Sequence, residues 1–509
     1  MDNTSTDIAR LIQGCESEQL HLSGAIQPFG AMLCIDTATE RITHASANLK
    51  AFLGVEPTAV LGQPMATLDW LPQRSLDGLS LTVGKKETVT HIAGIGNASI
   101  NATLIRGNGS VLIELEASAQ LKEPISFQQH QRPLMAVPGN IEELEIYHRT
   151  LLAGIRVVTG FRRCMIYRFQ EDWVGEVIAE MADEGAGAYL GLRFPASDIP
   201  AIARNLYLLN ASRMIPDSAA TPVPVLGVEG MPPDLSQSDL RSVSPVHLEY
   251  LHNMGVAASF SVPIIVAGQL WGLVACHHGE PRLLSPDQRA TCEALTAVYA
   301  LGHMSYTSAH RLQMIDSLDR TTDRVLESIA EHDDPLDGIE RNGELLMKAL
   351  GASGFAFAVG TNVVIVGDGP DLDGLAMLDD WFLQQCKDSI FLTDHLAEVL
   401  TTVLTDVSTD VSTDSNLSFL GVAGFVGVKA RSVRSGWLRL YWFRAEEVQS
   451  IAWAGNPQKP ISENAGAISL SPRRSFERWV ETKRGYCHAW SNEQKLVASK
   501  FRNGLLRWL

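Results

Sequence analysis

The residues best able to bind a ligand cluster between positions 190 and 280. This stretch is largely apolar, yet it holds two arginines, Arg213 and Arg241, together with histidines, tyrosines and serines. A guanidinium group can bind a carboxylate through two parallel hydrogen bonds. Together with two serines, two histidines and two tyrosines in an otherwise apolar domain, the two arginines suggest a large, flat, anionic ligand. Taken one at a time, each arginine is better explained as a surface charge and each histidine as a satisfied core residue.

Two prolines frame an aspartate inside this stretch. Pro195 and Pro200 disfavour helical backbone at the residues before them, Phe194 and Ile199. We therefore expect an irregular, extended backbone around Asp198. Carbonyl groups left unpaired in such a segment can accept hydrogen bonds from a ligand.

Common catalytic signatures are missing from the sequence. Gly94-x-Gly96 and Gly367-x-Gly369 lack the third glycine of a dinucleotide-binding loop, and no phosphate-binding, zinc-protease or serine-hydrolase motif is present. The dense cluster Cys276-His277-His278 is a poor metal site, because adjacent strand residues point to opposite faces. We expect no catalytic site and no metal in these residues.

Length and composition limit the class of protein. At about 150 residues per domain, 509 residues correspond to roughly three domains. Hydrophobic residues make up 45% and charged residues 19%, as in globular chains. The net charge of −17 disfavours nucleic-acid and anionic-membrane partners. There is no apolar run of ~20 residues and no secretory signal, and the seven cysteines are scattered, so we expect a cytoplasmic protein.

The elements that must position the clustered residues can be predicted from hydrophobic patterning. The first segment is predicted to contain strands Phe29–Asp36 and Arg41–Ala45 and a short helix capped by Ser46 and ended by Gly54. Asn108-Gly109 predicts a hairpin turn between two later strands. This order of elements is typical of a PAS-type sensor domain.

A second α+β unit is predicted after a polar stretch, Pro124–Gln131, which we expect to be a loop. It begins with helix Ile141–Val158 and strand Cys164–Phe169. After a long irregular middle, it ends with strands Ala258–Val266 and Gly272–His277.

From Ser285 onward the pattern is that of one long helix. Its apolar stripe follows heptad spacing through Ile315, Leu318, Thr322, Val325 and Ile329, and Leu301 and Met304 extend it backwards. The packing face of a connecting helix and the seam of a parallel dimer explain this stripe about equally well.

A third α+β unit follows. It contains an acidic tetrapeptide repeat at residues 405–416, which indicates a solvated loop, and a long insertion, Ile451–Arg478. The last segment, Asn492–Leu509, is predicted to be an amphipathic helix.

Three strings of the clustered stretch together closely resemble the bacterial phytochromes. They are Phe194–Pro200, Ser244–His247 with Asn253–Gly255, and Leu270–His278. The resemblance covers nearly the whole chain and implies an α+β fold of three domains, PAS, GAF and PHY, with antiparallel sheets flanked by helices. The expected parts are an attachment segment (1–18), PAS (19–123), GAF (132–300), a connecting helix (301–329), PHY (330–490) with an inserted tongue at about 451–478, and a C-terminal helix (491–509).

The same resemblance gives Cys15 a role. In bacteriophytochromes, a cysteine just before the PAS domain forms a thioether with a vinyl group of biliverdin. Here Cys15 precedes Leu20–Gly30, which is very similar to the family's sequence at that place. Val246 stands where plant and many cyanobacterial phytochromes carry their attachment cysteine. The resemblance therefore implies biliverdin IX-alpha as the cofactor, attached at Cys15.

The resemblance also assigns the carboxylate-binding end of the site. Arg213 and Arg241 would bind the two propionates of biliverdin, and Tyr207, Ser259 and Ser261 would supply further donors.

The other pocket roles follow in the same way. The Asp198 carbonyl and a water held by His247 would accept from the pyrrole N–H groups, and His277 would bond to the D-ring carbonyl. Three aromatic residues would wall the D-ring, and two residues after the aspartate would complete the pocket: Tyr167, Phe194, Tyr250, Ile199 and Pro200.

Two strings resemble the markers of the family's tongue. They are Trp453-Ala-Gly455, where the family often has two glycines, and Pro472–Phe476. By resemblance, Arg473 would pair with Asp198 in the dark state, with Trp453 and Ser475 as further relay residues. An ordinary basic loop at residues 473–474 is the alternative.

The resemblance as a whole implies a red/far-red photoreceptor of bacterial signal transduction. It would be a homodimer that relays the photoisomerisation of biliverdin to an output domain, a histidine kinase or diguanylate cyclase expected after Leu509. The alternative is a GAF-type sensor of a small diffusible ligand with a vestigial tetrapyrrole site. Intact Cys15, Asp198, His247 and His277 argue against that alternative.

Overall fold

The computed structural model describes most of the chain, namely residues 19–71, 79–93, 99–118, 127–228, 231–332, 335–360, 362–405, 421–432, 436–457, 461–464, 467–470 and 475–506. The chain forms two compact units. The first comprises Met1–Tyr306 and Ala452–Trp479, and the second comprises Thr307–Ile451 and Val480–Leu509. Among the described helices, none is long and apolar enough to cross a membrane.

The first unit begins with an N-terminal sheet. In spatial order its strands are β1 (Ala25–Ile26), β11 (Val223–Gly227), β3 (Arg41–Ser46), β2 (Gly30–Asp36), β6 (Ser110–Ala117), β5 (Ser99–Arg106) and β4 (Lys86–Ala93). Beside it lie α2 (Leu49–Leu53), α3 (Pro57–Val60) and the 3₁₀ turns Leu20–Leu22 and Met65–Thr67.

The first two predicted strands and the predicted hairpin turn are confirmed, whereas the start of the short helix is wrong. The hairpin turns at Gly109, whose φ of 73° suits glycine, and Gly54 ends α2. Helix α2, however, begins at Leu49 rather than directly after Ser46. The Ser46 hydroxyl accepts a hydrogen bond from the Met32 N–H (2.9 Å), which keeps Ser46 in β3.

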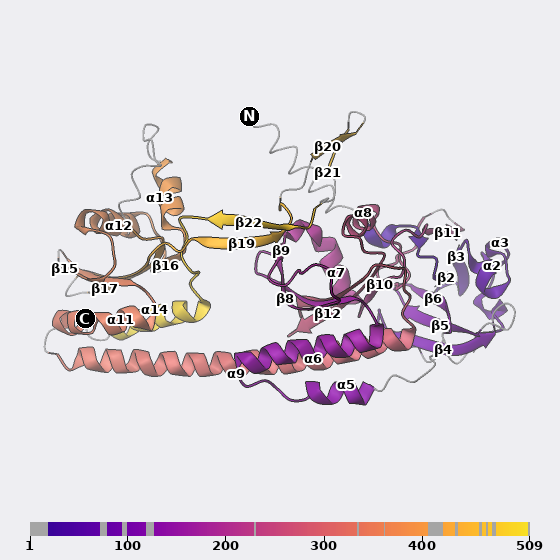
Figure 1. Ribbon diagram of the computed structural model, residues 1–509, viewed down its shortest axis with the longest axis horizontal. Coiled ribbons are helices and arrows are strands. Elements are labelled where there is room, and N and C mark those ends of the chain that lie inside the picture. Colours follow the sequence, from indigo (N-terminus) through magenta and orange to yellow (C-terminus); the bar gives the residue numbers. More distant parts are fainter. Residues whose placement is uncertain are drawn as a thin grey trace. The chain divides into compact units, whose positions relative to one another are not determined.

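One strand of the N-terminal sheet comes from far along the chain. Strand β11 pairs antiparallel with β3 and with β1, and Figure 1 shows it beside β3. Sequence patterning indicated only an irregular middle here, because a short strand containing a proline carries no alternation of its own. Strand β11 therefore joins the N-terminal sheet to the chain segment that carries Arg213 and Arg241.

A second sheet positions the candidate site. In spatial order its strands are β10 (Arg213–Ile215), β12 (Ala258–Val266), β13 (Gln269–His278), β7 (Arg163–Phe169), β8 (Gly175–Ala182), β9 (Arg193–Phe194), β19 (Gln449–Ala454) and β22 (Arg478–Lys483). Its helices are α5 (Phe127–Leu134), α6 (Ile141–Thr159), α7 (Ala201–Leu209), α8 (Pro245–Asn253) and α9 (Pro286–Ala330). The predicted helix α6 and strands β7, β12 and β13 are confirmed.

Two local predictions in this region are wrong. Residues 127–131 belong to helix α5 rather than to a loop, because Phe127 and Leu134 pack on the core and leave the polar residues outside. Asp198 lies in a 3₁₀ turn (Ala196–Asp198) instead of extended backbone. Its N–H donates to the Pro195 carbonyl at 3.0 Å, and the flanking prolines do not prevent that turn.

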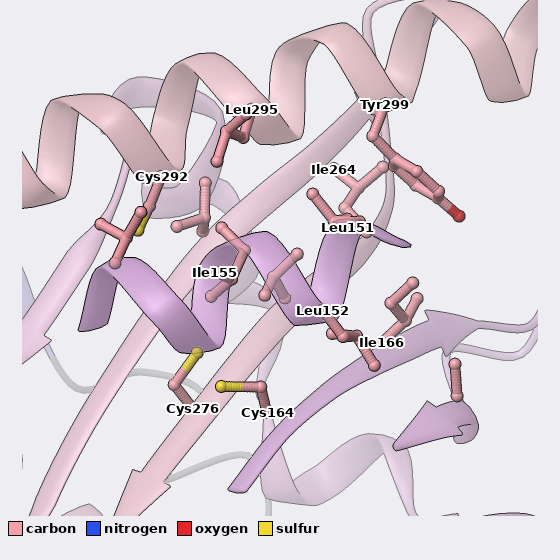
Figure 2. Close-up of a cluster of buried hydrophobic side chains, with 14 of the residues drawn as sticks. Leu151, Leu152, Ile155, Cys164, Ile166, Ile264, Cys276, Cys292, Leu295 and Tyr299 are labelled. Atoms are coloured by element: carbon pink, nitrogen blue, oxygen red, sulfur yellow. The ribbon is translucent and has the colours of Figure 1, made fainter. Parts of the chain in front are cut away.

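Helices α6 and α9 cover one face of the second sheet. Figure 2 shows their shared core, to which α6 contributes Leu151, Leu152 and Ile155, α9 contributes Cys292, Leu295 and Tyr299, and the strands contribute Cys164, Ile166, Ile264 and Cys276. Because strand side chains alternate between faces, His277 projects away from the core that buries Cys276.

The second unit is built on its own antiparallel sheet. In spatial order its strands are β15 (Asn362–Gly367), β14 (Gly354–Val359), β18 (Gly436–Arg444), β17 (Gly424–Ser432) and β16 (Ile390–Thr393). Its helices are α10 (Pro335–Arg341), α11 (Gly343–Ala349), α12 (Leu372–Gln384), α13 (Leu396–Thr405) and α14 (Asn492–Leu505). A separate hairpin, β20 (Ile461–Asn464) and β21 (Ala467–Leu470), belongs to the first unit. The acidic repeat beyond Thr405 lies outside the described residues.

Helix α9 contains the heptad stripe. Val325 and Ile329 are buried in the core of the second unit, Thr322 is buried beside them, and Leu318 packs against that core. Leu301, in contrast, is 65% exposed. From Leu318 onward, the stripe is therefore the packing face of a connecting helix.

A buried ion pair ties α9 to the N-terminal sheet. The Arg289 Nη2 donates to both carboxylate oxygens of Glu116 on β6 (2.7 and 2.8 Å), and the two side chains are only 9% and 10% exposed. We expect Glu116→Gln to lower the free energy of unfolding by about 3–5 kcal/mol, because it leaves a buried guanidinium uncompensated. Urea unfolding measures this effect. Glu56→Gln, which removes an exposed pair with Lys50, is the control, and an equal effect of both changes would contradict the prediction.

Candidate functional site

The first unit encloses a cavity of about 240 Å³. Every predicted cofactor residue in the described part of the chain lines it: Tyr167, Phe194, Asp198, Ile199, Pro200, Tyr207, Arg213, Arg241, His247, Tyr250, Ser259, Ser261 and His277. Cys15 lies outside the described residues.

Strand alternation explains how the sheet contributes to this cavity. On β13, His277, Ala275 and Leu273 face the cavity, and on β7 Tyr167 and Met165 do so. Sequence reasoning missed Met165, Leu273 and Ala275, although counting every second residue back from His277 and Tyr167 finds them. Strand β10 adds Ile215, which lies two residues after Arg213. The helices and loops add lining residues without such a signal: Leu20, Ser197, Ile202, Ala203, Leu206, Asn210, Ser212, Ser238, Ser242, Val243, Ser244, Val246, Leu251 and Met254.

One end of the cavity is cationic. Arg213 is half-buried and donates to the carbonyls of Arg241 (2.6 Å) and Ser242 (3.1 Å), while Arg241 is 6% exposed. Burial, and then the charge of Arg241, lower the pKa of Arg213 to about 9, and burial also lowers the pKa of Arg241. Among the described residues neither guanidinium forms an ion pair with a carboxylate. Two adjacent, sheltered cations of this kind fit a ligand that carries carboxylates.

Neutral donors lie beside the two arginines. The hydroxyl groups of Tyr207 and Ser261 are hydrogen-bonded to each other at 2.8 Å, and Ser261 stands opposite Arg213 where β12 pairs with β10. Burial raises the pKa of Tyr207, so its hydroxyl stays protonated at neutral pH. This phenol can therefore donate a hydrogen bond to an anionic ligand.

Two histidines, His247 and His277, line the cavity. Burial, then Arg213, lower the pKa of His247 to about 4, and burial, then Arg163 and His247, lower that of His277 to about 3. Both rings are thus neutral at pH 7, each with one donor and one acceptor nitrogen. The His277 Nδ1 is buried and has no hydrogen-bond partner among the described residues, so it can serve a ligand group.

The lowered pKa of His277 makes stability depend on pH. The unfolded state binds a proton near pH 6.5 and the folded state only near pH 3, so stability is complete above pH 6.5 and falls below it. Between pH 7 and pH 5, we expect this histidine to account for about 2 kcal/mol of lost unfolding free energy in the ligand-free protein. Urea unfolding at both pH values should show a smaller loss in His277→Gln. The exposed control His252→Gln should lose as much unfolding free energy as the wild type, and an equal loss in His277→Gln would contradict the prediction.

Aromatic rings form the other end of the cavity. The Tyr167 and Phe194 ring centroids lie 5.7 Å apart, and Tyr189 meets Phe194 edge to face at 5.9 Å. Gly175 makes room for Tyr167, because a Cβ there would lie 1.7 Å from the tyrosine ring. The Tyr250 hydroxyl donates to the Asp198 carboxylate at 3.0 Å. This end can therefore pack against an apolar ring while forming few hydrogen bonds to it.

Residues of the predicted tongue lie beside this aromatic end. Trp453 on β19 pairs in parallel with Arg193 on β9, and the Phe476 ring meets the Tyr250 ring edge to face at 5.0 Å. Gly455 has a φ of 80°, and a Cβ there would lie 2.0 Å from the carbonyl of Ser475, which is exposed. Only glycine at position 455 allows the backbone segments around Gly455 and Ser475 to approach so closely. Arg473 lies outside the described residues, so its pairing with Asp198 stays a prediction.

Three family models match successive parts of the chain. They describe a PAS fold over residues 15–118, a GAF domain over residues 143–301 and a phytochrome region over residues 318–509. The chain is also similar to solved structures over 97% of its length. One is the phytochrome photosensory core module of Stigmatella aurantiaca (TM-score 0.78, 32% identity, 97% of that chain). Another is a bacteriophytochrome of R. palustris (TM-score 0.78, 29% identity, 98% of that chain).

Curated relatives agree with this match. The bacteriophytochrome of Xanthomonas campestris is 33% identical over 94% of this chain and 75% of its own length. Cyanobacterial phytochrome B of Nostoc is 32% identical over 97% of this chain, which spans only 66% of that relative's length. With its PAS, GAF and PHY matches in order and its cavity inside the GAF part, the chain belongs to the bacteriophytochrome family of light photoreceptors.

Proposed function

We propose that the cavity holds biliverdin IX-alpha, attached through a thioether at Cys15, and that the chain senses red and far-red light. The observation that carries this proposal is the pair of sheltered arginines, which have no carboxylate partner in the described part of the chain, next to neutral histidines and an aromatic end. A bound bilin supplies red-light absorption and isomerisation at its C15=C16 double bond. A family likeness to bacteriophytochromes supports the choice of a bilin.

The chain's own residues would divide the work of holding it. Arg213 and Arg241 would bind the propionates, with Tyr207, Ser259 and Ser261 as further donors. These five side chains line the cavity, and both serines lie on β12.

The pyrrole and D-ring contacts would come from the other wall. The Asp198 carbonyl and His247 would serve the pyrrole nitrogens. The His277 Nδ1 has no hydrogen-bond partner within the described ranges, which favours a contact with the D-ring carbonyl. Tyr167 and Phe194 would leave that ring free to turn.

Adding biliverdin to the ligand-free protein tests the proposal. We expect a red absorption band that shifts to the far red under red light, and a much weaker band in Arg213→Met/Arg241→Met. A protein that takes up no biliverdin would favour the alternative, a GAF-type sensor of a small diffusible ligand.

We also propose that the protein is a cytoplasmic homodimer that passes the light signal to an output activity, a histidine kinase or diguanylate cyclase. The chain spans 66% and 64% of two curated relatives, so this activity concerns the whole protein. We propose the same domain boundaries as those expected from the sequence.

The dimer would use the part of the heptad stripe that the second unit does not bury. Leu301 is exposed and Ile315 is half-buried on α9. We expect Leu301→Glu/Ile315→Glu to weaken dimerisation, because charges buried in a seam without partners are costly. Light scattering measures the mass, with Ser317→Glu on the same helix as the control. An unchanged dimer mass would exclude this stripe as the interface.

A further inference from the structure

The turn between β7 and β8 contains an unusual backbone conformation. Trp173 has a φ of 65°, in the left-handed region that disfavours every residue with a side chain except in special turns. Its N–H donates to the Gln170 carbonyl (3.0 Å), and the Val174 N–H donates to Asp172 Oδ1 (3.0 Å). A glycine would adopt this turn without strain, so the tryptophan side chain must offset the strain through its own contacts.

Among the described residues, Phe169 and Arg204 contact the indole ring, and the contact with Arg204 leads to the candidate site. Phe169 meets it edge to face at 5.7 Å, and the guanidinium of Arg204 lies over it, 4.5 Å from the ring centroid. A cation over an indole face is the strongest arrangement of this type. Trp173 therefore holds the side chain of Arg204, a residue of helix α7.

Arg204 in turn holds the backbone around Asp198. Its Nη1 donates to the carbonyl of Ile199 at 2.5 Å and approaches that of Ala196 at 3.4 Å. These two carbonyls bracket the 3₁₀ turn that carries Asp198. Because each peptide unit is planar, fixing the carbonyls on both sides restricts the orientation of the Asp198 carbonyl between them.

Other contacts of this turn orient different groups. The Asp198 N–H donates to the Pro195 carbonyl at 3.0 Å, which fixes the peptide plane before Asp198 rather than the plane of its own carbonyl. Pro195 and Pro200 restrict their own φ angles, which does not set that carbonyl plane either. The Tyr250 hydroxyl binds the Asp198 carboxylate, which is on the side chain and does not orient the carbonyl.

We propose that Trp173 and Arg204 act as a clamp, a pair of positioning residues that fixes the Ala196–Ile199 turn so that the Asp198 carbonyl meets the pyrrole nitrogens of the bilin. This inference rests on the proposed function. It makes a partly exposed tryptophan outside the cavity a determinant of the pigment's protonation. A carbonyl that accepts from the pyrrole N–H groups stabilises the protonated, red-absorbing pigment, and a loosened carbonyl stabilises it less.

The test is a pH titration of the red absorption band after assembly with biliverdin. As the pH is raised, we expect Trp173→Gly and Arg204→Gln to lose the red band at a pH at least about one unit below that of the wild type. This shift corresponds to a proton affinity of the pigment that is about tenfold lower or more. Trp173→Phe should keep most of the wild-type behaviour. The double variant should be little worse than either single one, because both changes remove the same clamp.

Trp173→Gly separates positioning from stability. Glycine relieves the left-handed backbone, so the thermal midpoint should not fall much, although the titration shifts. A matched control is Trp437→Leu in the second unit, where an equally exposed tryptophan (39%, as for Trp173) lies 5.9 Å from Arg431. This control should titrate like the wild type.

The outcomes distinguish the clamp from the proposed function. A red band that titrates alike in the wild type, Trp173→Gly and Arg204→Gln would overturn the clamp alone. A shift of the titration in Arg204→Gln without one in Trp173→Gly would also overturn the clamp, because the indole ring would then not be needed to position Arg204. A wild-type protein without any red band would overturn the proposed function and, with it, the clamp.

Discussion

Cys15→Ser protein loaded with biliverdin is expected to show no zinc-induced fluorescence in its band on a denaturing gel, whereas the wild type fluoresces. A serine hydroxyl cannot replace the thiol as the nucleophile, because it is not appreciably ionised at neutral pH, so no covalent bond to the pigment forms. The cavity contacts lie on other residues, from Arg213 to His277. Part of the pigment should therefore still bind without a covalent bond and give a red band in the native protein.

A second cysteine provides the control for this experiment. Cys386 lies in the second unit and is partly exposed, so Cys386→Ser should keep the fluorescent band. Covalent pigment in Cys15→Ser would show that another thiol carries the attachment. Loss of the band in both variants would point to a general effect on folding.

Arg473→Ala is expected to bind biliverdin and absorb red light normally, yet to form little stable far-red product. In the proposed dark state Arg473 pairs with the Asp198 carboxylate, and removing one partner of a buried pair costs ~3–5 kcal/mol, less where water reaches it. The Asp198 carbonyl, which would serve the pigment, is unchanged by this substitution. Absorption spectra after red illumination measure the product, and hydrogen exchange should become faster across Trp453–Phe476.

The pairing itself is tested by a double variant. Asp198→Ala should reproduce the photoproduct defect, and the double variant should be little worse than either single one. Arg474→Ala controls for the loss of a neighbouring positive charge. The Asp198 carboxylate also accepts a hydrogen bond from Tyr250, so a defect in Tyr250→Phe together with a normal Arg473→Ala would assign the relay to the tyrosine instead.

The sequence by itself determined the elements whose signals are local. Strand Ala258–Val266 and the start of helix α14 at Asn492 agree with the patterning, because alternation and helix caps act within a few residues. The glycine turn at Gly109 is equally local. The cavity residues were predicted from resemblance to a family rather than from their spacing, because each of them taken singly had an ordinary explanation.

The tertiary structure decided everything that depends on pairing between distant segments. Strand β11 joins β3 of the N-terminal sheet, and the stripe of α9 from Leu318 onward meets the core of the second unit. Neither partner could be chosen from the sequence, because an edge or an apolar stripe specifies that it must be covered but not which segment covers it. The contact of Trp173 with Arg204 is of the same kind: two residues with unremarkable local signals gain a role only when the fold stacks one on the other.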